Sequence, residues 1–343
     1  ISAVLNITDI AGIVAGAHEG KGLGNAFLSH IGAVDALFHL VRVFPNNTTG
    51  TSHCHTHTHS HSESVSVLLF SHCVVFPPHL RAGKQVEHVE GTINPIRDMT
   101  IISQELLLKD AALIETAIAK ATKAAKGSSD PRRHQQLATY KRAQELIAKG
   151  VDVREGDWNE AEADFLVEVG LLTAKPIVYL LNGSIEQYIS GYTPQLAEVR
   201  AWIAKRSPGA ASILFSADLE ADLQLMEPEE RDAYVQDLVA EIPRHPEALP
   251  LVDLGGMQPS YLQQEAMKVS EQTKSMIPVI VTSGYNALRL VQYFTTGTDE
   301  VRAWTIREGS TAPQAAGIIH SDFEKNFVCA EVMSYNDLVE LGS

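Results

Sequence analysis

The fold is decided by the stretch Asp9-Ile-Ala-Gly12-Ile-Val-Ala-Gly16-Ala-His-Glu-Gly20-Lys-Gly-Leu-Gly24-Asn25. An apolar run at residues 3–7 precedes it and predicts a short buried strand. Nucleotide triphosphatases place an aspartate at such a strand end to support Mg²⁺. A glycine three positions later lets a backbone N–H approach the γ-phosphate. The glycine-rich continuation predicts a switch that becomes ordered around phosphate. Asp-x-x-Gly alone also fits a strand end followed by a loop.

The longer run from Asp9 to His30 is far more specific than those four residues. It resembles the switch II region of the Obg-like ATPases, the family of the bacterial ribosome-binding ATPase and its eukaryotic counterpart. A second block that resembles the family is Val86-Glu-His88-Val-Glu-Gly91, and a third begins near Leu288. The resemblance covers most of the chain in several blocks.

Composition excludes several classes of protein. The 343 residues include 42 acidic and 27 basic side chains, for a net charge of −15, which argues against broad non-specific binding to nucleic acid. No apolar run approaches the roughly 18–20 residues of a membrane span, and no signal-peptide pattern is present. The three cysteines form neither a metal motif nor a disulfide framework, which suits a reducing cytosol.

The resemblance implies an α/β fold: an incomplete P-loop NTPase (G-domain-like) sheet, an inserted helical hairpin domain and a C-terminal β-grasp (TGS) domain. We expect a partial nucleotide-binding domain at 1–96, a helical insertion domain at 97–170 and the second part of the nucleotide-binding domain at 171–242. Prolines and glycines predict an irregular insert at 243–270, and the TGS domain is expected at 280–343. The chain starts inside a strand and stops before the last strands of a β-grasp sheet, so we expect both ends to be incomplete.

Residues 45–84 interrupt the resemblance and are rich in Ser, Thr and His. Alternate histidines in the tract at 53–61 would share one face of an extended segment, which could capture zinc or nickel. A second ligand cluster with matching spacing is missing, and the tract at 53–61 holds no acidic residue to orient the imidazoles. We therefore favour a low-complexity insert without a function of its own.

Two later loops are predicted to meet the nucleotide base. The apolar run at 175–182 predicts a strand that ends at Asn182, where guanine-nucleotide proteins keep Asn-Lys-x-Asp. Here the sequence is Asn182-Gly183-Ser184-Ile185-Glu186, and an isoleucine cannot accept hydrogen bonds from guanine. The resembled family has Asn-x-x-Glu and uses ATP, so the resemblance implies adenine preference, although this glutamate is shifted by one position. Ser216-Ala217 follows the next strand and matches the loop that packs against the base. Ser216 can equally be a helix N-cap.

Phosphoryl transfer also needs a phosphate cradle and a group that positions water. The cradle motif, Gly-x-x-x-x-Gly-Lys-Ser/Thr, is absent from this sequence, and the segment from Gly16 to Lys21 is one residue too short to replace it. In the family both the cradle and switch I precede the point where this chain begins. Ile13 stands directly after Asp-x-x-Gly, where Ras-like enzymes carry the glutamine that positions water, and an isoleucine cannot do this. The resemblance implies that His88 orients the water instead. The alternative is that His88 is only a surface histidine.

These inferences combine into one hypothesis. The chain is expected to be a cytoplasmic ATPase that uses Mg²⁺, with ATP as substrate and the ribosome as partner through its large subunit. The implied roles are Asp9 at the metal, Gly12 at the γ-phosphate, His88 at water, and a base site formed by Asn182, Gly183, Ser216 and Ala217. No membrane or DNA partner is expected, and the oligomeric state is left open. Without a cradle, we expect weak nucleotide binding and little hydrolysis.

Two other classes of function stay open. The first is a non-catalytic module that binds the ribosome, RNA or a protein through the helical hairpin and the TGS domain. Its candidate contacts are Arg302, Arg307, His320 and Lys325, which can equally be solvated surface charges. The second is metal storage by the histidine tract.

Overall fold

The computed structural model describes residues 7, 9–10, 31–32, 34–44, 67–68, 93–297, 300–334, 337 and 340. Gly12, His88 and the histidine tract lie outside these residues. The chain divides into two compact units, one spanning Leu5–Ala287 and the other containing Leu288–Ser343. Of the helices that the structure describes, none has the length and apolarity needed to cross a bilayer.

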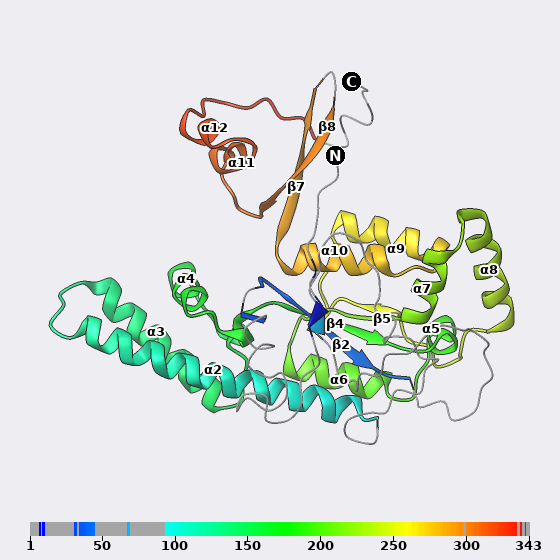
Figure 1. The fold of residues 1–343 in the computed structure, drawn as a ribbon, viewed down its shortest axis with the longest axis horizontal. Coiled ribbons are helices and arrows are strands. Elements are labelled where there is room, and N and C mark those ends of the chain that lie inside the picture. The colour runs from blue at the N-terminus through cyan, green and yellow to red at the C-terminus, as the bar shows by residue number, and fades with distance from the viewer. Residues whose placement is uncertain are drawn as a thin grey trace. The chain divides into compact units, whose positions relative to one another are not determined.

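The larger unit is built on a six-stranded sheet with the order β1-β3-β2-β4-β5-β6 (Figure 1). Its strands are β1 (Asp9–Ile10), β2 (Leu37–Arg42), β3 (Val67–Leu68), β4 (Ile177–Asn182), β5 (Ser212–Phe215) and β6 (Val252–Asp253). The central strands β2, β4 and β5 are parallel, and β3 and β6 pair with them in the antiparallel direction. Sequence and structure therefore agree on a mixed α/β fold with a parallel core.

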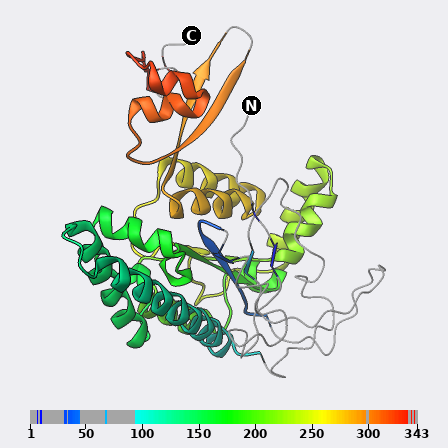
Figure 2. The same cartoon turned by 60° about the vertical axis from the view of Figure 1, so that its left-hand side comes forward.

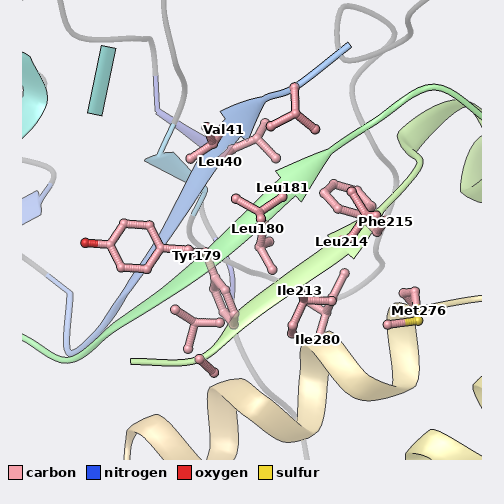
Figure 3. Close-up of a cluster of buried hydrophobic side chains, with 14 of the residues drawn as sticks. Leu40, Val41, Tyr179, Leu180, Leu181, Ile213, Leu214, Phe215, Met276 and Ile280 are labelled. Atoms are coloured by element: carbon pink, nitrogen blue, oxygen red, sulfur yellow. The ribbon is translucent and has the colours of Figure 1, made fainter. Parts of the chain in front are cut away.

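The core lies on both faces of these parallel strands. β4 is buried along its whole length, as expected for a parallel strand covered on both sides. Figure 3 shows Ile280 of α10 (Ile277–Ala287) and the preceding Met276 directed toward the strand residue Ile213. The opposite face is covered by α6 (Leu196–Arg206) and the first turns of α2 (Pro95–Ala125) (Figures 1 and 2).

The predicted helical hairpin is present. Helix α2 has Asn94 as its N-cap and Pro95 in its first turn, and it pairs with α3 (Pro131–Ala148). Helix α4 (Glu160–Val169) packs beside them, and a second, smaller core joins these helices. Asp110, which is fully buried on α2, accepts hydrogen bonds from the N–H groups of Leu172 and Thr173 at 2.7 and 2.8 Å. This carboxylate thereby ties the hairpin to the segment that leads into β4.

Residues 243–270 differ from the sequence expectation. They are irregular through most of the proline-rich part but contain β6 and most of α9 (Tyr261–Thr273). The prolines end at Pro259, and Ser260 then forms a capping box with Gln263, which starts a helix. Two further helices, α7 (Ala217–Leu225) and α8 (Pro228–Glu241), precede this segment.

The smaller unit holds a two-stranded antiparallel sheet and two short helices. Its elements are β7 (Leu290–Thr296), β8 (Val301–Arg307), α11 (Ala312–Ile319) and α12 (Ser321–Lys325). Trp304 donates a hydrogen bond to the Thr295 hydroxyl at 2.9 Å, and the Arg302 guanidinium lies 4.2 Å from the Trp304 ring centroid. Within residues 288–334, none of the described side chains is fully buried.

A buried carboxylate anchors the helix pair α9–α10 to the rest of the larger unit. Glu220 on α7 is 1% exposed and accepts hydrogen bonds from Met276 N at 2.6 Å and the Ser275 hydroxyl at 2.7 Å. Nearby, the Tyr188 hydroxyl donates to the carbonyl of Lys274 at 2.8 Å. Burial raises the pKa of Glu220 to about 7, although both hydrogen bonds act to lower it.

This shift predicts an effect of pH on stability. Because the folded pKa lies above the unfolded value, Glu220 favours the folded state fully at low pH, and this contribution is lost as pH rises from about 4.5 to about 7. The free energy of unfolding of the wild type, minus that of Glu220→Gln, should fall by roughly 3 kcal/mol across this window. Urea titrations at a series of pH values measure it, and a pH-independent difference would contradict the assignment.

Candidate nucleotide site

The loops that follow the parallel strands meet at one edge of the sheet. In the register of β2, β4 and β5, Arg42 lies beside Asn182, and Asn182 lies beside Phe215. All three strands therefore end level with one another. In open α/β sheets, ligands bind outside the carboxyl ends of such strands. We call this place the carboxyl edge.

Asn182 joins the loops of this edge. Its side chain is 4% exposed, and its Oδ1 accepts a hydrogen bond from the Ala217 N–H at 3.0 Å. The backbone supports the same alignment, because Gly183 N donates to the Phe215 carbonyl and Val43 N to the Asn182 carbonyl, both at 2.9 Å. The structure thus brings together the four residues of the predicted base site, which are Asn182, Gly183, Ser216 and Ala217.

Ser216 is the N-cap of α7. Its hydroxyl accepts from Leu219 N at 3.5 Å, so the alternative role considered for this serine is present. The N–H of Ala217 belongs to the first turn of α7, where backbone donors have no partner within the helix. Asn182 satisfies this donor. One asparagine therefore fixes both the start of α7 and its distance from β4.

The position three residues after Asn182 does not hold a carboxylate. Ile185 packs against the main core, and Glu186 is exposed in the first turn of α5 (Ile185–Ser190). Ser184 instead forms a capping box with Gln187. The Oδ1 of Asn182 already accepts a hydrogen bond from Ala217 N, and the amide nitrogen of an asparagine is a donor. A donor suits a purine ring nitrogen and cannot substitute for the carboxylate that selects guanine.

Sequence reasoning missed Arg42 at this edge. Its guanidinium carbon lies 4.1 Å from the centroid of the buried Phe44 ring, and its Nε donates to the Phe44 carbonyl at 3.4 Å. A planar guanidinium can stack on a ring or bind phosphate oxygens, so it places a fixed positive charge beside Asn182. The only signal in the sequence was a basic residue at the end of an apolar strand.

Asp9 lies apart from this cluster. It pairs with Leu68 of β3, which pairs with Phe38 of β2, and Phe38 is level with Val178 of β4. Asn182 is four residues further along β4 and three strands away. These offsets correspond to about 13 Å along the strands and about 14 Å across them. The base residues therefore form a group that does not include Asp9.

A buried histidine on β2 belongs to the core. His39 is 2% exposed, its ring centroid lies 5.2 Å from that of Tyr179, and burial and the nearby Arg154 charge lower its pKa to about 3. Asp152 pairs with both Arg154 and Arg206 below the same part of the sheet. His39 is thus neutral at physiological pH. Among the described residues, no group of three or more His, Cys, Asp or Glu side chains is arranged to hold a metal.

Comparison with known proteins identifies relatives along the whole chain. Obg-like ATPase 1 of rat and of human are each 38% identical over 345 residues, and Obg-like ATPase 1 of chicken is 36% identical over 348 residues. Each comparison covers 100% of this chain and 69% of the relative. Residues 290–343 match the family model YchF-GTPase_C, described as a protein of unknown function (DUF933).

The solved structure of the Schizosaccharomyces pombe YchF GTPase is also similar, with a TM-score of 0.66 and 33% sequence identity. The match covers 93% of this chain and 67% of that chain. The sheet, its covering helices and this match define the class as proteins with a P-loop NTPase fold. Within that class, the chain belongs to the Obg-like ATPase (YchF) family.

The bond between Asn182 and Ala217 predicts a stability effect. Asn182→Leu keeps the approximate side-chain size but leaves the buried Ala217 N–H without its acceptor, which should cost about 1–3 kcal/mol in the free energy of unfolding. Asn286→Leu is the matched control, because that half-buried asparagine bonds only a serine hydroxyl in the described structure, at 3.1 Å. Urea denaturation compares them, and equal losses would contradict the special role of Asn182.

Proposed function

We propose that this chain is a nucleoside-triphosphate hydrolase that prefers ATP. The observation that carries the proposal is the assembled group at the carboxyl edge, where Asn182 aligns two loops at the ends of parallel strands. Family membership supports the same activity, since the relatives are named as an ATPase and a GTPase. ATP preference is supported by Ile185, which stands three positions after Asn182, packs against the core and has no carboxylate to read guanine.

The phosphate end of the proposed site rests on the sequence. We assign Asp9 to Mg²⁺, Gly12 to the γ-phosphate and His88 to the attacking water. One carboxylate is compatible with Mg²⁺, which proteins often bind through one or two carboxylates and the phosphates of the substrate. When bound, the ion would neutralise charge on the transferring phosphoryl group.

The rate of the proposed reaction should be low in this chain. The 343 residues contain no Gly-x-x-x-x-Gly-Lys-Ser/Thr motif, so the backbone donors and lysine that usually surround the phosphates are missing from them. Electrostatic stabilisation of the transition state usually supplies the greatest part of the rate enhancement in such enzymes. We further propose that the chain acts in the cytosol and associates with ribosomes.

Nucleotide titration tests the proposal. We expect calorimetry to show stoichiometric binding of ATP·Mg²⁺ to the wild type and weaker binding of GTP·Mg²⁺. Asn182→Ala should weaken ATP binding by about tenfold because it removes the acceptor that aligns the Ala217 loop with the end of β4, whereas the control Asn286→Ala should not.

Three results would count against this function. If the wild type did not bind ATP at all, the proposed hydrolase function would be contradicted. If it bound GTP more tightly than ATP, the proposed adenine preference would be contradicted. Co-sedimentation with ribosomes that is unaffected by nucleotide, together with no ATP binding, would favour the non-catalytic binding module.

A further inference from the structure

The turn of the helical hairpin has a charge opposite to that of the rest of the chain. Residues 116–142 contain seven lysines and arginines and one acidic residue, Asp130. The remaining residues contain 20 basic and 41 acidic side chains. A positive segment therefore projects from a strongly acidic protein.

Most of these cations belong to the end of α2 and the start of α3. Figure 1 shows the turn that joins these two helices. We define the hairpin tip as the exposed residues Lys120, Lys123, Lys126, Arg132, Arg133 and His134. The three lysines are spaced by three residues and span about 9 Å along the helix axis. Among the described residues, no hydrogen-bond or ion-pair partner is found for the ammonium groups of these lysines.

Helix stability does not explain this arrangement. Lys123 and Lys126 lie near the negative end of the α2 dipole, where a cation is favourable. Arg132 and Arg133, however, lie in the first turn of α3, where cations are unfavourable and the nearest acidic group is the N-cap Asp130. A local rule broken in this way points to a functional site.

Some of these charges are available to a partner. Arg133 donates to the Ala124 carbonyl at 3.1 Å and lies 3.7 Å from Asp130, so it is partly engaged. Arg142 is excluded from the tip, because it pairs with Glu162 at 2.9 Å and stacks on Trp158. The Arg132 guanidinium lies 5.7 Å from the Phe165 ring centroid, and His134 Nε2 lies 2.9 Å from the Ser128 carbonyl oxygen. The three lysines are the main cations that remain.

The chemistry of the tip fits a phosphate backbone. Among the described residues, the exposed large hydrophobic side chains include Leu108 and Val167 but none at the tip, which leaves no apolar anchor for a membrane or protein core. With Tyr140 buried, the tip also lacks an aromatic surface for stacking unpaired bases. Exposed Ser129 and Gln135 can bond sugar hydroxyls, which double-stranded RNA presents and DNA lacks.

We propose that the hairpin tip binds the backbone of double-helical RNA. This inference rests on the proposed ribosome association and specifies its partner surface. The acidic remainder of the chain confines the contact to the tip, since it repels phosphate elsewhere.

Binding of a short RNA duplex, measured by fluorescence anisotropy at several salt concentrations, tests the proposal in the full chain. Lys120→Glu/Lys123→Glu/Lys126→Glu should weaken binding by about tenfold or more and flatten the slope of log K against log salt by about two to three. The control Lys149→Glu/Lys205→Glu/Lys268→Glu changes the net charge equally on exposed lysines elsewhere and should keep the wild-type slope. Circular dichroism establishes that both variants fold.

The outcomes separate the alternatives. If both triple variants lost the same RNA affinity, the loss would be explained by net charge alone, and the proposal would be overturned. Absence of RNA binding by the wild type would also overturn it. Equal or tighter binding of a DNA duplex of the same sequence would overturn the assignment to RNA. Both triple variants should keep wild-type ATP affinity, so failure to bind RNA while ATP still binds would remove the hairpin assignment and leave the proposed hydrolase intact.

Discussion

One hydrogen bond organises the functional end of this protein: the Asn182 Oδ1 accepts from the N–H of Ala217 across the ends of β4 and β5. Both groups are buried, so neither can exchange this partner for water without cost. The bond fixes where β4 ends and where α7 starts. The shape of the carboxyl edge follows from it, because Gly183, Ser216 and the first turn of α7 all take their positions from these two residues.

The rest of the larger unit keeps that edge in place. β4 is buried throughout between two layers of helices, and buried carboxylates attach the outer helices to the segments around it. Asp110 on α2 bonds Thr173 in the segment before β4. Glu220 on α7 bonds Met276, which directly precedes α10. These carboxylates stabilise the framework, whereas the exposed charges at the hairpin tip contribute little to it.

Much of the local structure could be predicted from the sequence. The run at 175–182 predicts β4 because an apolar segment that ends at a polar residue is a local signal. Helix α9 was missed because the neighbouring prolines and glycines outweighed the capping box at Ser260. The family resemblance indicated which residues would form the base site.

Partners distant in sequence could not be predicted in this way. The acceptor role of Asn182 toward Ala217 joins residues 35 positions apart, and the stacking of Arg42 on Phe44 depends on how β2 ends. The register of Asp9 depends on its pairing with β3, a segment from the predicted insert. Such pairings are set by the assembled sheet and leave no periodic pattern in the chain.

Hydrogen exchange at the Ala217 amide tests the central claim most directly. If Asn182 holds this N–H, it should exchange as slowly as the amides of β4 in the wild type and much faster in Asn182→Leu, although the first turn of a helix normally exchanges rapidly. Rapid exchange of Ala217 in the wild type, or protection that survives the substitution, would show that the carboxyl edge does not depend on this bond.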